Sequence, residues 1–304
     1  MDTKHTLICS SLFYLSMFFI STELKADNQS ASDLKTTVDF SQGYRREKLN
    51  LKLKSKEAAG TIHTKTHFDD IDVYSSRLGI TFTKHDYFLK TVLGYGYVYD
   101  GKFSTPSVTK NGTSTERFNM NSDVTGSYTA DIALTVGKNF SCGNGWIIAP
   151  TIGYGVYMQD FHTNHGKMHY DDNGHKKHLK GLKHKLKTTW FTPQIGINIK
   201  KAITSTLSAH VDYALLYPLN YRATGYYNTM FKGSRYQQNN KPYKSFGNIA
   251  TLGLEWNFAP NWSLKPEIEL MKFYSKGGDS SHRFDLQSVN RTATEFRIGL
   301  GYQF

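Results

Sequence analysis

Cysteine is scarce in this chain, since only Cys9 and Cys142 occur among its 304 residues. Cys9 lies in an amino-terminal segment that we expect to be removed, and the single remaining cysteine excludes an internal disulfide framework and a cysteine-based zinc site. Long hydrophobic runs are scarce as well. Beyond residue 20, no stretch approaches the roughly 20 apolar residues of a membrane-spanning helix. The sequence therefore predicts a fold without disulfides and without a helical anchor.

The amino terminus has the pattern of a signal peptide. An apolar run at residues 7–20 follows Lys4, and a short polar stretch then ends at Ala26, directly before Asp27. A charged flank, a short apolar core and a small terminal residue are typical of an exported protein, with cleavage after Ala26 or a few residues away. We therefore exclude residues 1–26 from the fold and assign residues 27–304 to a single domain.

Acidic residues are outnumbered, with 25 Asp and Glu against 37 Lys and Arg and a formal net charge of +12. This excess survives cleavage, because two acids and two lysines lie within residues 1–26. A basic exported protein suggests an anionic partner, and charge alone does not choose among lipopolysaccharide, other surface polyanions and nucleic acid. We expect lipopolysaccharide and outer-membrane lipids as partners, and no nucleic acid.

Helical periodicity is absent, and the last nine residues show a two-residue alternation instead. Their even positions would share one face of a strand, and these are the apolar residues Phe296, Ile298, Leu300, Tyr302 and Phe304. This pattern predicts a lipid-facing strand. A terminal Phe is also typical of bacterial outer-membrane barrels, whose last strand is read by the insertion machinery.

Similar alternation marks about ten strands and no competing helix. The candidate strands are residues 35–54, 61–84, 87–100, 122–139, 146–161, 184–200, 205–225, 244–258, 262–277 and 290–304. An even number is expected of a single-chain bacterial barrel. The predicted fold is therefore all-β, a transmembrane antiparallel β-barrel of about ten strands located in the outer membrane.

The connections between these strands alternate in length. Short turns are expected at residues 85–86, 141–145, 202–204 and 259–261, and longer polar segments at 55–60, 101–121, 162–183, 226–243 and 278–289. Short periplasmic turns and long extracellular loops are typical of outer-membrane barrels, whereas a β-sandwich has no reason to sort its loops by end.

The same alternation collects the charged residues on the inner face. This inward set is Asp39, Arg45, Glu47, Asp131, His210, Asp212, Glu255, Lys265, Glu267, Glu269, Glu295 and Arg297. About ten strands enclose a narrow lumen, so we expect these side chains to pair with one another and exclude a wide pore. In the first strand the pattern breaks near Lys48 and Leu49, which predicts either a bulge or the start of an extension above the membrane.

His210 and Asp212 form a His-x-Asp pair on one strand face. A carboxylate can orient an imidazole for general-base catalysis. The pair follows closely after the short turn at residues 202–204, which places it near the periplasmic end, away from external substrates. We interpret it as an interior structural pair.

The layout resembles the ten-stranded omptin-type barrels and the Protochlamydia outer membrane protein family. The matching stretches are residues 43–50, 149–154, 187–196 and the closing strand. The resemblance implies the barrel. For omptins it also implies a surface protease that needs bound lipopolysaccharide, with two aspartates on one side of the barrel mouth and an Asp-His pair on the other.

This sequence lacks the aspartate pair and the Asp-His pair at the positions where the resemblance to omptins would place them. After the third strand only Asp100 is present, and residues 221–229 contain neither aspartate nor histidine. Asp171, Asp172 and Asp279 are the remaining acids that could substitute. We therefore predict no catalytic residues, with Asp100, Asp171 and Asp172 as weak candidates.

The predicted third long loop, residues 162–187, is rich in histidine and lysine. The candidate polyanion-binding residues are His165, Lys167, His169, His175, Lys176, Lys177, His178, Lys180, Lys183, His184 and Lys185. Imidazoles can capture metals or gain charge near neutral pH, but dense lysines repel a divalent cation and favour an anion. We predict no metal site. A solvated loop without a partner is the simpler alternative.

These observations favour a non-enzymatic outer-membrane barrel that acts in surface interaction or envelope structure. We expect a monomer without a cofactor. An omptin-type protease with displaced catalytic acids and a small porin remain as alternatives.

Overall fold

The computed structural model describes residues 34–57, 60–105, 108–110, 113–116, 119–172, 175–227, 234–240, 244–276 and 284–304. Residues Lys35–Phe304 form one compact unit, and the predicted signal peptide lies outside the described residues. No helix in the described part of the chain is long and apolar enough to cross a membrane. The strands are β1 (Leu34–Glu57), β2 (Gly60–Lys84), β3 (Tyr87–Thr105), β4 (Val108–Lys110), β5 (Thr113–Glu116), β6 (Asn119–Val124), β7 (Ser127–Lys138), β8 (Phe140–Ser141), β9 (Trp146–Asp172), β10 (His175–Ala202), β11 (Leu207–Leu216), β12 (Asn220–Tyr227), β13 (Ser234–Asn240), β14 (Lys244–Ala259), β15 (Trp262–Lys276) and β16 (Phe284–Gln303).

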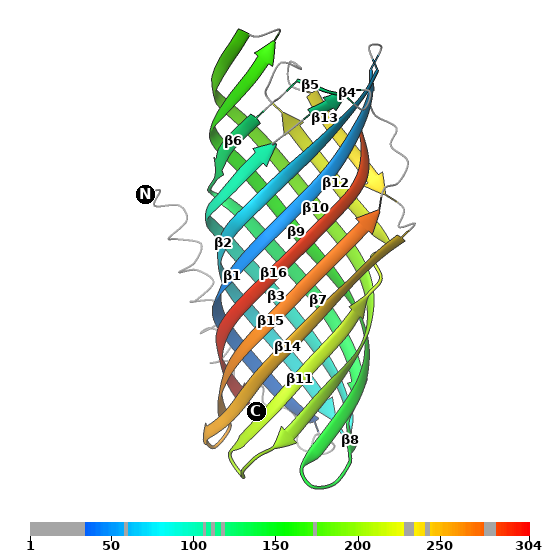
Figure 1. Cartoon of the computed structure of the whole chain (residues 1–304). Coiled ribbons are helices and arrows are strands. Elements are labelled where there is room, and N and C mark those ends of the chain that lie inside the picture. Colours follow the sequence, from blue (N-terminus) through cyan, green and yellow to red (C-terminus); the bar gives the residue numbers. More distant parts are fainter. Residues whose placement is uncertain are drawn as a thin grey trace. The chain divides into compact units, whose positions relative to one another are not determined.

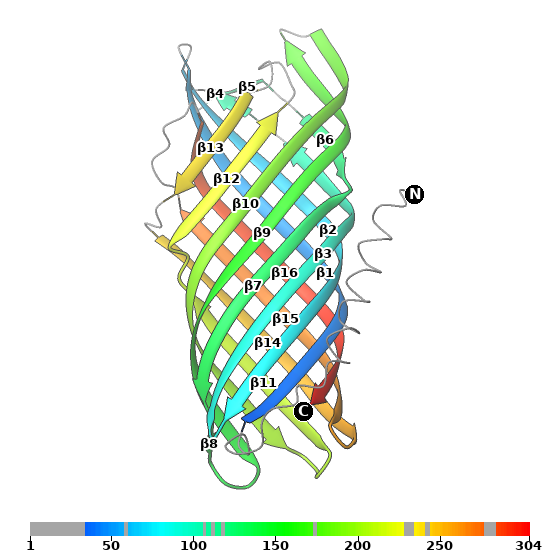
Figure 2. The ribbon, with the colours of Figure 1, turned by 180° about the vertical axis from the view of Figure 1, so that it is seen from behind.

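The strands close into an antiparallel ring. Its wall runs β1, β2, β3, β7, β9, β10, β11, β14, β15 and β16, and β16 pairs with β1 from Thr37↔Gln303 to Ser55↔Phe284. Figures 1 and 2 show this closed wall from two sides. The ring has about ten strands, which confirms the predicted all-β barrel.

Two of the predicted wall strands are interrupted. The expected strand at 122–139 divides into β6 and β7 at Gly126, whose φ of +66° is easily adopted only by glycine. The expected strand at 205–225 divides into β11 and β12 around Pro218, which has no backbone N–H to donate. β6 and β7 pair with the same two neighbours, β3 and β9. β11 and β12 share β10, and on their other side β11 pairs with β14 and β12 pairs with β13.

The outer surface carries an apolar band next to the short turns. Trp146 and Trp256 are exposed near the turns, and Tyr97 and Tyr99 are exposed toward the other edge of the band. In β16 the predicted lipid-facing residues Phe296, Ile298 and Leu300 are exposed on this band, as is Phe304 at the end of the chain. The backbone N–H of Phe304 donates to the carbonyl of Thr36 at 2.8 Å, which holds the chain end against β1.

Beyond this band the strands continue, and the inside–outside chemistry reverses. In β1, Leu49, Leu51 and Leu53 are buried inside, whereas Lys48 and Lys52 are exposed. The register does not shift at Lys48, because the irregularity lies between Lys52 and Leu53. The prediction of a bulge near Lys48 is therefore wrong, and the strand instead continues with its inward and outward residue types exchanged, as the alternative of an extension requires.

This extension also corrects the prediction of long loops. Most of residues 162–187 belong to β9 and β10, which pair from Trp146↔Lys201 to Asp172↔His175 as one long hairpin. The segment 101–121 likewise contributes strand residues to β3, β4, β5 and β6. The reason is that apolar side chains fill the barrel above the lipid band, where water permits a polar outer face.

Candidate functional site: the barrel interior and the basic hairpin

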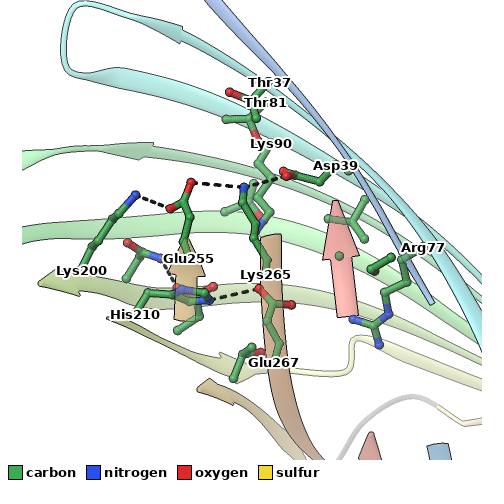
Figure 3. A pocket seen from close by; sticks show the side chains of 18 of the residues that line it. Thr37, Asp39, Arg77, Thr81, Lys90, Lys200, His210, Glu255, Lys265 and Glu267 are labelled. Carbon is green, nitrogen blue, oxygen red and sulfur yellow. Dashed lines mark hydrogen bonds and ion pairs between the residues drawn. The ribbon is translucent and has the colours of Figure 1, made fainter. Parts of the chain in front are cut away.

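A chamber of about 810 Å³ occupies the end of the barrel that carries the short turns. Asn139, Pro260 and Asn261 line it, so it opens at the turns. Figure 3 shows ion pairs on its walls: the Lys265 ammonium lies 2.6 Å from Asp39 and 3.6 Å from Glu255. Glu255 also pairs with Lys200. These residues come from β1, β10, β14 and β15, so the chamber exists only once the ring is closed.

His210 and Asp212 both line this chamber but do not form a catalytic dyad. His210 Nε2 lies 3.1 Å from Glu267 Oε1, and Asp212 accepts a hydrogen bond from the amide of Asn198. Both lie at the end of the barrel that carries the short turns, close to the turn at residues 202–204 as expected. Among the described residues, His210 thus contacts β15, across β14, and Asp212 contacts the neighbouring β10, but the two side chains do not contact each other.

A layer of buried arginines and carboxylates forms the roof of the chamber. Arg77 lies 2.7 Å from Glu269 and 2.8 Å from Glu295, and Arg297 lies 3.0 Å from Glu269. The layer continues upward through Arg45, with Asp131 at 2.9 Å. Its highest pair joins Arg291 to Glu47 at 2.9 Å. Because each charge has an opposite partner, the low-dielectric interior can hold them all.

The predicted interior network divides between these two levels. Asp131, Glu269 and Arg297 take part in the ion-pair layer, and the chamber walls hold Glu255, Lys265, Glu267, His210 and Asp212. The inward set omitted Arg77 and Arg291. Both lie on the inward parity of their strands, Arg77 with Ser75 and Gly79, so the same alternation rule would have found them.

An apolar cluster closes the lumen above the ion-pair layer. Trp190 is 0% exposed, and its ring centroid lies 4.3 Å from Tyr221 and 5.2 Å from Phe273. The Arg291 guanidinium lies over Phe273 at 5.5 Å, which joins the two layers. Further residues of the cluster include Leu49, Phe68, Phe103, Tyr157 and Phe161. In the described part of the chain, side chains therefore fill the lumen at this height.

The candidate polyanion-binding residues lie on the β9–β10 hairpin. The side chains of His165, Lys167, Lys180, Lys183 and Lys185 are exposed. The Lys185 ammonium lies 3.4 Å from Asp160, a buried carboxylate that also contacts His162 at 2.9 Å. Five of the remaining six candidates lie in the paired strands, with side chains outside the described set: His169, His175, Lys176, Lys177 and His178.

His184 corrects the prediction, because its side chain faces the interior. It is 5% exposed, and its ring stacks on Phe103 with the centroids 5.1 Å apart. Burial lowers the pKa of His184 to about 4, since a charged imidazole would lose its hydration. His184 is therefore a neutral part of the apolar filling at neutral pH, and it is not available to an external anion.

The weak catalytic candidates do not meet. Asp100 is exposed on β3, where its carboxylate accepts a hydrogen bond from the N–H of Gly101 at 2.8 Å. The register pairs Lys102 with Asp123 and Asp123 with Asn164. Asp171 and Asp172 lie at least seven residues farther along β9, which is roughly 20 Å of strand. No group of three metal-binding side chains occurs among the described residues.

The sequence matches the family model described as Protochlamydia outer membrane protein over residues 39–298. The chain belongs to the Protochlamydia outer membrane protein family. Membership in this family places the protein in the outer membrane. No curated protein matches the chain.

The outer membrane protease OmpT from Escherichia coli has a similar solved structure. The TM-score is 0.70 at 11% identity, covering 93% of this chain and 100% of OmpT. The translocator domain of the autotransporter NalP from Neisseria meningitidis matches with a TM-score of 0.35 and 13% identity, covering 99% of this chain and 98% of that domain. At this identity the likeness to OmpT shows the fold alone.

Replacing Glu269 with Ala should destabilise the barrel by about 3–5 kcal/mol, because Arg77 and Arg297 would keep buried charges without their shared partner. Urea unfolding of the protein refolded in lipid vesicles measures this loss. The control, Asp123→Ala on the exposed face, should change stability by less than about 0.5 kcal/mol. Equal effects of the two substitutions would contradict a structural role for the ion-pair layer.

Acidification should destabilise the folded protein through His184. The pKa of His184 is about 4 in the folded state against 6.5 for an ordinary histidine. Between these values the unfolded chain binds a proton that the folded chain does not, so this stability is present above pH 6.5 and lost as the pH falls toward 4. The free energy of unfolding of wild type should therefore decline more steeply over this window than that of His184→Leu. Parallel pH profiles would show that His184 is not buried.

Proposed function

We propose that this protein is a non-enzymatic, sealed outer-membrane barrel that binds anionic saccharides at the cell surface, either lipopolysaccharide or another surface polyanion. The main observation in support of this proposal is a row of lysines on the outer face of the extension. Lys183, Lys185 and Lys187 are exposed at alternate positions of β10, while His184 and Leu186 between them are buried. Alternate residues of a strand lie about 6.7 Å apart on one face.

Neighbouring strands add to this basic face. Arg222 on β12 is exposed beside β10, opposite Thr189. Lys167 on β9 is exposed and pairs in register with exposed Lys180 on β10. Of the described acids beside this face, Asp160 is buried and already contacts Lys185, and Asp123 is exposed on β6, two residues from the partner of Lys167. The exposed charge of this face is therefore mainly positive, as an anionic partner requires.

The geometry favours binding over catalysis. A hydrolytic site needs a base held within hydrogen-bond reach of an activated water or nucleophile and a second group to orient it. The candidates Asp100, Asp171 and Asp172 are separated by the register of β3, β6 and β9. Peptide cleavage that disappears in Asp100→Asn would instead favour the protease alternative.

A polyanion should bind the basic face in a salt-dependent manner. The triple variant Lys183→Gln, Lys185→Gln, Lys187→Gln should lower affinity for heparin and for lipopolysaccharide about tenfold, at roughly 0.5 kcal/mol for each exposed ionic contact. Raising the salt concentration from 0.1 to 1 M should abolish most of the binding, because the Debye length falls from about 10 to about 3 Å. Surface plasmon resonance on the refolded protein measures both effects.

The matched control removes three lysines at the opposite end of the barrel, Lys35, Lys84 and Lys138. It has the same net charge as the triple variant, so equal losses in both would mean that only overall charge matters. Binding should also strengthen as the pH falls, since histidines gain charge near neutral pH. An affinity that does not depend on pH would remove the histidines from the proposal.

The sealed lumen predicts no stepwise conductance in planar lipid bilayers. Ions would have to cross both the ion-pair layer and the cluster around Trp190 and Phe273, where each of these two side chains is 0% exposed. A wide porin added to the same bilayer serves as the control for insertion and detection. Regular current steps from the purified protein would instead support the small-porin alternative.

A further inference from the structure

Two charged residues that line the chamber at the short-turn end take no part in the ion pairs described above. Most charged residues of its wall pair with an opposite charge, as Lys265 does with Asp39 and Glu255. Lys90 and Asp212 also line the chamber, but neither forms an ion pair with any described residue. The carboxylate within electrostatic range of Lys90 is Glu267, and it is already paired with Arg297 at 2.6 Å and contacts His210 at 3.1 Å. Figure 3 labels Lys90 among the residues that line the chamber.

Both residues have polar surroundings that can contact a ligand. Lys90 lies between Thr81 on β2 and Thr135 on β7 in the register. Asp212 lies between Asn198 on β10 and Thr251 on β14, and it accepts a hydrogen bond from Asn198. Each of these neighbours lines the same chamber. The two charges are therefore surrounded by hydroxyl and amide groups that can donate or accept hydrogen bonds.

The ring places the two charges on nearly opposite walls. Lys90 belongs to β3 and Asp212 to β11, and three wall strands, β7, β9 and β10, separate them on the shorter side. About ten tilted strands spaced about 4.8 Å apart give a ring roughly 20 Å across between backbones. Subtracting the two side chains leaves a gap of roughly 10 Å. An extended chain of three residues spans about 10 Å.

We propose that the chamber binds a short zwitterionic peptide that enters from the periplasm. Its carboxylate pairs with Lys90 and its amino group pairs with Asp212, while its amides contact the hydroxyl and amide groups between them. Lys90 and Asp212 are a cation and an anion on facing walls, each without an ion pair among the described residues, and together they select a ligand that carries both charges at its ends, over a dianion or a diamine. The chamber volume of about 810 Å³ accommodates such a peptide with water.

This site is independent of the basic hairpin. The ion-pair layer and the apolar cluster separate the chamber from the extension. Loss of polyanion binding therefore leaves the chamber proposal unaffected, and failure of peptide binding leaves the surface proposal unaffected.

Isothermal titration calorimetry with trialanine tests the proposal on the protein refolded in detergent. Blocking the peptide amino group by acetylation, or its carboxylate by amidation, should each weaken binding at least tenfold, because each removes one charged contact. Asp212→Asn should bind trialanine more weakly and should no longer distinguish it from the acetylated peptide. Lys90→Met should likewise lose the distinction between trialanine and its amide.

The matched controls are Lys84→Met and Asp86→Asn. Both residues are exposed at the turn between β2 and β3 and do not line the chamber, so both variants should bind trialanine as wild type does. Heat-modifiable migration in gels confirms that each variant is folded. The blocked peptides test the site even if a variant fails to fold. No binding at millimolar peptide, or equal affinity for free and blocked peptides, would overturn the proposal.

Discussion

The structure depends on one constraint, which is that every backbone N–H and C=O inside a lipid bilayer needs a partner within the protein. The pairing of β1 with β16 meets this constraint by removing the last open sheet edge. Closure also fixes which face of every strand points inward. Arg297 and Ile298 are adjacent in sequence, yet one faces an interior carboxylate and the other an apolar environment. Closure of the ring thus causes both the burial of charged side chains in the lumen and the exposure of apolar side chains on the outer wall.

The solvent outside the wall decides what the wall encloses. Along the lipid band the exposed positions must be apolar, so polar groups are left to the lumen, where they remain stable only as paired charges. Above the band the exterior is water, so the free energy is lower when polar side chains face outward and apolar side chains face inward. In β1, therefore, the inward residues change from Arg45 and Glu47 to Leu49 and Leu51 without any change of register. The ion-pair layer and the apolar cluster meet at this transition, where Arg291 packs on Phe273.

The barrel could be predicted from the sequence because alternation is a local signal that repeats in every wall strand. The inward position of Glu269 and Arg297 follows from that signal alone. The break of pattern near Lys48 allowed for an extension of the first strand, but the length of the extension in the other strands could not be predicted, since its outer face is polar and its strands resemble loops. His184 is buried by Phe103, which lies some eighty residues earlier in the sequence, so only the closed ring reveals its environment. The lack of an ion pair for Lys90 and for Asp212 within the described part of the chain is equally non-local, because it depends on which side chains the other walls supply.

The same reasoning explains why the fold alone does not identify the chemistry. Alternation constrains residue classes and not residue identities, so a chain that shares 11% of its residues with OmpT can still superpose on it with a TM-score of 0.70. The features that distinguish this protein are those that closure does not require. Lipid exposure does not demand lysines at Lys183, Lys185 and Lys187, and interior pairing does not explain Lys90 or Asp212. Function is therefore best sought at two places, the outer face of the extension and the chamber at the short-turn end, which the filling of the lumen keeps chemically separate.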